Sequence, residues 1–258
     1  MSAPQKLDVK TAALAIIGNE ILSGRTQDMH TAWIAERLTN NGVLLGEVRI
    51  IPDDEALIVS TVNDLRQRYE LVLTTGGIGP THDDITAFCI AKAFGVPLER
   101  NEDAYHLLEE HYGVQEMTPP RIKMSMLPKG ARLIPNPVTA APGFVIQNVY
   151  VMAGVPRIMQ AMFDYILGTV KTDKPILSNT VTCSLMESVL AEDLSQLQDR
   201  YPDTQIGSYP HYRGGVLGLS IVIRAIDDSR LEVATKELIE LIRAHGDEPR
   251  ALNIRAGG

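Results

Sequence analysis

The chain has 258 residues, of which 45% are hydrophobic and 22% are charged, values that favour a folded globular protein and argue against intrinsic disorder. A formal net charge of −8 argues against a general nucleic-acid binder, which needs a basic face, but allows a local site for a small anion. The first ten residues are polar and no stretch has the roughly 18 apolar residues of a membrane span, so we expect a cytoplasmic protein without a membrane partner.

The first part of the chain alternates short apolar runs with stretches of helical spacing. The apolar runs predict buried strands at 11–17, 43–51 and 70–75, and the spacing predicts helices at 29–41, 52–68 and about 83–94. Strands that alternate with helices form right-handed βαβ units, so we predict an α/β fold with a mostly parallel sheet.

The second part of the chain predicts further elements and a separate domain. In order, we expect a helical region at 101–126 interrupted by Pro119-Pro120, strands at 143–147 and 149–153 with Asn148 at the turn, a helix at 154–167, a linker at 168–175, and a βαββα pattern over 177–246. That pattern fits a small α+β domain, which gives domains at 1–170 and 175–250 and a frayed tail from Glu248.

The strongest functional signal is the glycine-rich segment that follows the third predicted strand. It reads Thr75-Gly76-Gly77-Ile78-Gly79-Pro80-Thr81. Glycines let backbone N–H groups approach an anion, and the N-terminus of a following helix adds partial positive charge. In a parallel sheet such a turn faces the ligand crevice. The segment therefore predicts a phosphate site.

Two carboxylates, Asp83 and Asp84, follow the glycines directly. Carboxylates beside a phosphate are favourable when a cation lies between them, and Mg²⁺ commonly uses one or two carboxylates plus substrate phosphates. In the alternative interpretation, Thr81 caps the following helix and both aspartates complement its dipole. His82 between them is a candidate acid or base, or equally a solvated loop histidine.

The turn after the first strand opens on the same edge of the predicted sheet. Asn19, Glu20 and Asp28 offer polar or metal-binding groups, and the planar fork of Arg25 suits a phosphate. Each of these residues is also typical of turns and caps.

A third candidate ligand-binding segment runs from Asn136 through Gly143, with Gly154-Val155-Pro156 as a further part. Tight turns of a hairpin explain it equally well. The two cysteines, Cys89 and Cys183, form no CxxC motif, so we expect Cys89 to be a buried thiol and no disulfide framework.

These motifs together resemble the competence/damage-inducible protein A family and the molybdopterin-binding domain of eukaryotic FAD synthase. The resemblance covers about residues 11–245 and is carried by 18–24, 74–86, 141–144 and 206–210, of which Thr-Gly-Gly-Ile-Gly-Pro-Thr-His-Asp-Asp is the most specific. It implies a three-layer α/β domain of the molybdopterin-binding (MoaB/Mog-like) type and a small KH-like domain. Two segments depart from the family pattern: Gly154-Val155-Pro156-Arg157-Ile158 lacks a glutamate, and Asp28-Met29-His30 replaces Asp-x-Asn.

The resemblance also implies an activity, because several members hydrolyse the pyrophosphate of ADP-ribose or FAD with a divalent metal such as cobalt, and potassium. We therefore expect a metal-dependent nucleotide pyrophosphatase, with Gly76–Gly79 on the phosphates, Asp83 and Asp84 in catalysis, and Asp84, Glu20 and Asp28 around Co²⁺, Mn²⁺ or Mg²⁺. The alternative is a molybdopterin or nucleotide binder without turnover. Nucleic-acid binding is disfavoured, since the small domain lacks a basic GxxG loop. We expect a homo-oligomer.

Overall fold

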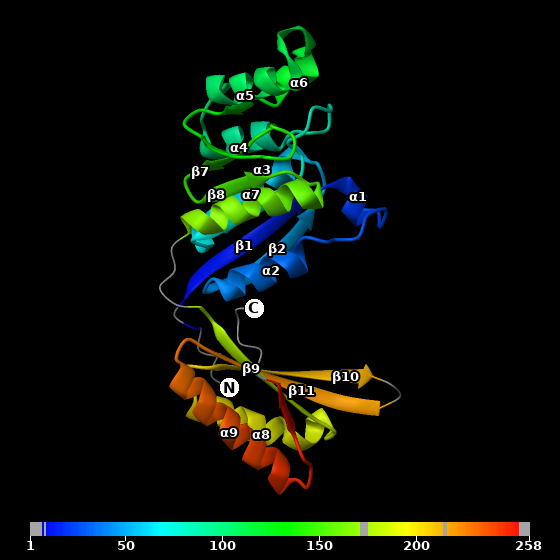
Figure 1. Ribbon diagram of the computed structural model, residues 1–258, viewed down its shortest axis with the longest axis vertical. Helices are drawn as coiled ribbons and strands as arrows, with labels where there is room; N and C mark the ends of the chain where they lie inside the picture. The colour runs from blue at the N-terminus through cyan, green and yellow to red at the C-terminus, as the bar shows by residue number, and fades with distance from the viewer. Residues whose placement is uncertain (1–6, 8, 171–174, 214–215, 253–258) are drawn as a thin grey trace. The chain divides into compact units, whose positions relative to one another are not determined.

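The computed structural model describes residues 7, 9–170, 175–213 and 216–252 (Figure 1). The chain divides into two compact units, of which the larger holds Lys10–Leu38 and Leu44–Lys171 and the smaller holds Met1–Val9, Thr39–Val43 and Thr172–Gly258. One buried apolar cluster lies within residues 13–151 and another within 181–242. The two units therefore have separate cores.

The larger unit is built on a six-stranded sheet of β1 (Lys10–Ile17), β2 (Val43–Ile51), β3 (Leu71–Thr75), β6 (Arg132–Ile134), β7 (Gly143–Ile146) and β8 (Val149–Met152). The strand order is β2-β1-β3-β8-β7-β6. Strand β3 is parallel to β1 and β8, whereas β7 runs antiparallel to β8 and β6. The N–H of Gly18 donates to the carbonyl of Ile51 at 3.0 Å, so β1 and β2 end at the same edge. The predicted mostly parallel sheet is confirmed.

Helices cover both faces of this sheet (Figure 1). Helices α2 (Thr31–Asn40) and α7 (Pro156–Thr169) lie together, with the ring of Trp33 5.5 Å from that of Phe163. Helices α3 (Glu55–Arg68) and α4 (Thr86–Phe94) pack on the other face, where their apolar side chains share a cluster with alternate residues of β1. The three-layer α/β arrangement follows from these two interfaces.

Helix α4 contributes the first of the two cysteines to this core. Cys89 is free and buried, as expected, and Cys183 is also free and buried. Burial raises the pKa of the Cys89 thiol to about 11, so this cysteine is an unreactive core residue.

Between α4 and the central sheet the chain makes a small excursion. Strands β4 (Leu98–Arg100) and β5 (Met126–Pro128) pair antiparallel and enclose α5 (Glu102–Tyr112), the 3₁₀ turn η1 (Val114–Glu116) and α6 (Pro119–Lys123). The helical region predicted over 101–126 is present as α5, η1 and α6, but its main break lies at Gly113 and not at Pro119-Pro120. Gly113, at φ +88°, ends α5, and Pro119 begins α6, where its missing N–H costs nothing.

The β7–β8 hairpin is as predicted. Gln147, at φ +51°, makes its turn with Asn148. The side-chain amide of Asn148 donates to the carbonyls of Arg66 (3.0 Å) and Tyr69 (2.9 Å). The hairpin turn thereby satisfies carbonyls at the C-terminal end of α3.

The smaller unit contains β9 (Leu177–Cys183), α8 (Glu187–Arg200), β10 (Gln205–Arg213), β11 (Val216–Ala225), α9 (Asp228–Ala244) and β12 (Arg250–Leu252). Its antiparallel sheet has the order β10-β11-β9-β12, and its apolar face packs against both helices. The predicted βαββα order is present. The frayed tail is wrong at 250–252, which pair with β9, and residues 253–258 lie outside the described residues.

Only part of the linker predicted at 168–175 can be compared with the structure. Gly168 and Thr169 still belong to α7, because no proline or capping residue stops the helix earlier. Residues 171–174 lie outside the described residues. Among the helices that the structure describes, none has the length and apolar character to cross a membrane.

Candidate functional site

The glycine-rich segment lies at the carboxyl end of β3, where it packs against the end of β1. Gly76 and Gly77 have φ values of +100° and +68°, which L side chains rarely adopt. A Cβ on Gly76 would stand 2.1 Å from the carbonyl oxygen of Ile17. Glycine is therefore required for both the backbone conformation and the close approach of two chain segments.

Helix α4 holds the same segment from the other side. The N–H of Thr86 donates to the carbonyl of Gly77 at 2.9 Å, and its hydroxyl donates to that of Gly76 at 3.0 Å. Within the described part of the chain, the N–H groups of Gly77, Ile78 and Gly79 have no acceptor. Consecutive unpaired N–H donors beside a helix N-terminus are suited to bind an anion.

Asp83 and Asp84 lie in a loop and not in the helix, so the prediction that the helix starts near 83 is wrong. Helix α4 begins at Thr86, with Ile85 at its N-cap and no side-chain cap. One carboxylate oxygen of Asp84 accepts from the N–H (2.8 Å) and the hydroxyl (2.5 Å) of Thr81. This local bonding competes with helix formation, and Thr81 therefore does not cap α4.

Asp83 shares the same hydroxyl, since its Oδ1 lies 2.6 Å from Oγ1 of Thr81. That hydrogen bond holds the pKa of Asp83 below its usual range. The neighbouring His82 side chain is 98% exposed and lies 3.9 Å from the Asp83 carboxylate, which places it in solvent.

The carboxylates of three different turns gather at this edge of the sheet. Partial burial, followed by the negative charges of Glu20, Asp83 and Asp84, raises the pKa of Asp53. Asp53 also accepts from the N–H of Asn19 at 3.1 Å. Asp53 was not among the predicted site residues, although its position after β2, matching that of Glu20 after β1, was a usable signal.

This group of carboxylates can be compared with the needs of a metal ion. Among the described residues, no three or more His, Cys, Asp or Glu side chains are arranged to hold one. A hard divalent cation bound through one or two carboxylates, water and ligand phosphates needs no such group. The all-oxygen donor set and the mutual repulsion of its carboxylates fit a cation of that kind.

Asp28, predicted as a metal ligand, stabilises the start of α2. Its Oδ1 accepts from the N–H groups of His30 (2.7 Å) and Thr31 (3.1 Å). Partial burial alone would raise the pKa of Asp28, but hydrogen bonds from Thr31, through its side chain and backbone, and from the backbone of His30 outweigh it and leave the pKa below its usual value. Its carboxylate is thus already engaged with the backbone.

His30 is a buried residue of the site that the sequence marked only as a departure from the family's Asp-x-Asn pattern. One ring nitrogen lies 3.1 Å from Oγ1 of Thr75, and the ring also interacts with the backbone of Gly154. Burial lowers the pKa of His30, so its neutral form is favoured. Thr75, predicted to contact ligand, directs its hydroxyl at this ring.

The other predicted residues have local roles. The amide of Asn136 is buried and donates to the carbonyl of Ala141 at 2.8 Å, while its Oδ1 accepts from the N–H of Val138 at 3.0 Å. Gly143 lies inside β7, where a Cβ would stand 2.5 Å from the carbonyl oxygen of Val151. Arg25 is exposed in the turn that follows the short helix α1 (Asn19–Leu22).

Lys123, at the end of α6, is a cation beside the loop that sequence reasoning missed. Its ammonium donates to the carbonyl of Thr81, and its charge helps to keep the pKa of Asp83 low. Only the excursion between β4 and β5 brings this residue to the loop, so its place could not be inferred from spacing.

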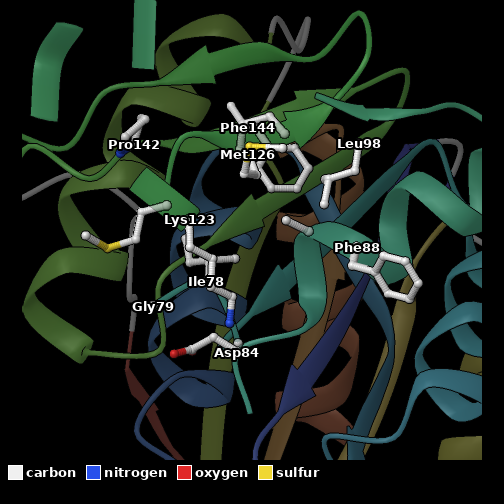
Figure 2. Close-up of a pocket in the computed structure, with 13 residues that line it drawn as sticks. Ile78, Gly79, Asp84, Phe88, Leu98, Lys123, Met126, Pro142 and Phe144 are labelled. Carbon is white, nitrogen blue, oxygen red and sulfur yellow. The ribbon is translucent and has the colours of Figure 1, made fainter. Parts of the chain in front are cut away.

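A pocket of about 50 Å³ opens next to the glycines (Figure 2). Its lining residues come from the loop, α4, the β4–β5 excursion and β7: Gly77, Ile78, Gly79, Asp84, Ala87, Phe88, Leu98, Lys123, Met124, Met126, Leu127, Pro142 and Phe144. The glycine-rich loop therefore borders an apolar surface.

Comparison with known families gives two matches along the chain. Residues 13–173 match the family described as probable molybdopterin binding domain. Residues 175–247 match the family described as FAD synthase, middle domain. Both agree with the resemblance inferred from the motifs, which is confirmed.

Several curated proteins are similar to this chain. A protein of Pyrobaculum calidifontis is 32% identical over 91% of this chain and 96% of its own length, and one of Sulfurisphaera tokodaii is 33% identical over 98% of each. A protein of Pyrobaculum arsenaticum is 42% identical, over 57% of this chain and 58% of its own. The crystal structure of the protein CinA with unknown function from Thermoplasma acidophilum is 34% identical, covers 62% of this chain and 98% of that one, and superposes with a TM-score of 0.60.

Proposed function

Because the chain belongs to the probable molybdopterin-binding domain family, we propose that it is a metal-dependent pyrophosphatase that hydrolyses ADP-ribose, FAD or a similar dinucleotide. The observation that carries the proposal is the run of unpaired N–H groups at Gly77, Ile78 and Gly79 next to carboxylates. N–H donors suit the phosphates, and carboxylates suit a cation and a water molecule, so together they suit hydrolysis of a phosphoric anhydride.

In the reaction, the oxygen of a water molecule forms a bond to one phosphorus and the bridging P–O bond breaks. The bridging oxygen leaves with the other phosphate to give two monophosphates, and of the two protons of the water one passes to solvent and the other stays on a product phosphate. The backbone N–H groups would neutralise charge on the phosphate oxygens, and a carboxylate oxygen of Asp84 or Asp83 would orient the water. Lys123 would add a positive charge from the α6 side.

Asp84, with Glu20 or Asp53, would hold the divalent cation, for which Co²⁺, Mn²⁺ and Mg²⁺ are the candidates. When bound, such an ion neutralises phosphate charge and lowers the pKa of the attacking water. Asp28 is a weaker candidate than first expected, because its Oδ1 is occupied by two backbone N–H groups. A potassium requirement stays a prediction.

Release of monophosphate from ADP-ribose and FAD, with and without each metal, tests the proposal. Asp84→Asn should lower turnover at least ~10²-fold, the usual loss for a catalytic polar group. The fold should persist, because an asparagine oxygen can still accept from the N–H of Thr81. Asp103→Asn removes an equal charge from the first turn of α5 and should leave turnover unchanged. Full activity of Asp84→Asn would contradict the assignment.

A second candidate is a molybdopterin or nucleotide binder without turnover. It is favoured by the lack, among the described residues, of a ready group of three metal-binding side chains. Tight binding of FAD or ADP-ribose without hydrolysis under any of the metals would select this function over the first.

A further inference from the structure

The antiparallel sheet of the smaller unit has one face that carries none of the unit's described helices. Helices α8 and α9 both lie on the opposite face, where they pack against buried residues such as Ile221 and Leu219 (Figure 1). Because alternate residues of a strand point to opposite sides of a sheet, every second residue of β9, β10, β11 and β12 lies on the helix-free face. A four-stranded sheet with such a face is a common surface for RNA.

The strand register determines which side chains share the helix-free face. Residues paired across strands lie on the same face, so the neighbours of one position identify the rest. Apart from two rings described below, the functional groups on this face are hydroxyls and guanidinium groups: Ser178, Thr180, Thr182, Ser220, Arg224 and Arg250. These groups can bond to phosphates and to ribose hydroxyls.

The charged side chains on the helix-free face all have one sign. Strands β9, β10, β11 and β12 contain no aspartate or glutamate. Within the described residues, neither Arg224 nor Arg250 pairs with a carboxylate, whereas each cation of α8 and α9 does: Arg200, Arg230, Lys236 and Arg243. A net charge of −8 disfavours nucleic acid for the chain as a whole, but this face keeps two guanidinium groups available to anions.

Two rings lie on the same face, each above a glycine of the sheet. A Cβ on Gly207 would stand 2.9 Å from Oη and 3.1 Å from Cε2 of Tyr209, and one on Gly218 would stand 2.8 Å from Nδ1 of His211. Tyr209 is nevertheless 49% exposed, so the outer side of its ring faces solvent. Nδ1 of His211 is buried and has no hydrogen-bond partner in the part of the chain that the structure describes. A ring held against a sheet with its outer side in solvent is suited to stack on a base.

We propose that the helix-free face of the smaller unit binds single-stranded RNA, with a base stacked on Tyr209 and phosphates at Arg224 and Arg250. His211 contributes the unpaired Nδ1 as a hydrogen-bonding group for the nucleotide. Single strands are required because stacking on a side chain needs an unpaired base. The hydroxyl groups of Thr180 and Ser220 favour RNA over DNA, since they can bond to the 2′-hydroxyl.

The size of the sheet fits a short segment of RNA. Neighbouring strands lie ~4.8 Å apart, so the three gaps between four strands span roughly 14 Å, which leaves room for a few nucleotides. The proposal does not rest on the proposed pyrophosphatase, because every residue that it uses belongs to the smaller unit.

Salt dependence tests the phosphate contacts. A short fluorescent oligouridine is titrated with the full chain, and its anisotropy is followed at several salt concentrations. Two phosphate contacts should give a log–log slope of about −1.4, at roughly 0.7 per contact on a single strand. Arg224→Gln should reduce the size of the slope by about 0.7. Arg230→Gln is the control, because it removes the same charge from α9 on the other side of the sheet, and it should leave the slope unchanged.

Substitution of Tyr209 tests the stacking contact. Tyr209→Ala should weaken RNA binding at least about fivefold, the factor for the smallest contribution of one stacked base. Tyr209→Phe keeps the ring and should keep the affinity. Tyr212→Ala is the matched control, because Tyr212 is 70% exposed on the same strand but pairs with Leu217 on the opposite face. It should bind RNA as the wild type does, and melting curves confirm that each variant is folded.

Three results overturn the inference. The first is an absence of oligouridine binding. The second is equal binding of oligodeoxyuridine, which differs only in its missing 2′-hydroxyls. The third is an equal loss of affinity in Tyr209→Ala and Tyr212→Ala, which would place the RNA elsewhere on the unit.

Discussion

A Cβ atom on Gly77 would stand 2.2 Å from Oγ1 of Thr86, closer than any real contact of that kind. The same hydroxyl donates to the carbonyl of Gly76, so it cannot move without losing a buried hydrogen bond. The glycine and the threonine thus fix the spacing between the loop and the first turn of α4. Two costs arise on substitution of Gly77, one from its positive φ and one from this contact.

Gly77→Ala should lower the free energy of unfolding by roughly 2–5 kcal/mol, about 1–2 for the left-handed backbone and 1–3 for the clash. Gly95→Ala is the matched control, because Gly95 has φ +65° but nothing within 4 Å of a Cβ. It should show only the backbone cost. Urea denaturation measures both, and equal losses would mean that Thr86 yields to the added methyl group without cost.

Asp53→Asn should stabilise the protein at neutral pH. Because the pKa of Asp53 is raised in the folded state, its carboxyl contributes most stability below its usual value of 3.8 and loses it as pH rises through the folded value. The variant's gain in melting temperature should therefore be present at pH 7 and absent near pH 3.8. Asp54→Asn, at the N-cap of α3, is the neighbouring control. A neutral-pH gain equal in both variants would refute the role of the carboxylate cluster.

His30 should make the protein sensitive to mild acid. Its pKa is lowered in the folded state, so its contribution is complete above the usual value of 6.5 and falls as pH drops from there through the folded pKa. His30→Gln should flatten the dependence of melting temperature on pH below about 6.5. It should also cost about 1–3 kcal/mol at pH 7.5 if the buried Thr75 hydroxyl loses its partner. His82→Gln, at a solvated position, should change neither; an unchanged slope in His30→Gln would contradict the assignment.

A chain truncated after residue 170 should fold and keep the ligand site. The apolar cluster under the loop draws its residues from 13–151, and every residue that lines the pocket lies between 77 and 144. Loss of the smaller unit therefore removes no part of that core. Cooperative melting and FAD binding by the truncated chain would support the domain boundary; an insoluble product would show that segment 39–43, which groups with the smaller unit, needs it.

Much of the fold could be predicted from the sequence because its signals are local. The runs at 11–17 and 43–51 are bounded by glycine, asparagine or proline, and these residues commonly end strands. The hairpin around Asn148 was equally clear. Strands β4, β5 and β6 were missed. Each has only three residues, which is too short a stretch to show the alternation of apolar and polar residues by which a strand is recognised.

The candidate site could be predicted only in part from the sequence. Glycine spacing identified the loop, and the resemblance named its neighbours, but side-chain partners are set by the assembled sheet. Thr81 bonds to Asp84 and not to α4, and Lys123 arrives from a distant helix. The spacing of residues along the chain predicts neither of these two contacts. It does not predict the burial of His30 beneath the loop either. The catalytic, metal-binding and ligand-binding roles of the named residues stay predictions.

The approach of Gly76 to Ile17 has a counterpart at Gly154, where a Cβ would lie 3.2 Å from Cα of Gly76. The rim of the site is thus a meeting of three backbones that are far apart along the chain. Bringing such distant segments together is slow and occurs only as the sheet closes. A peptide of residues 71–86 should consequently have no affinity for phosphate, and a refolding chain should gain its ligand affinity only after β8 has joined β3. The recovery of ligand binding would then report when the last step of folding is complete.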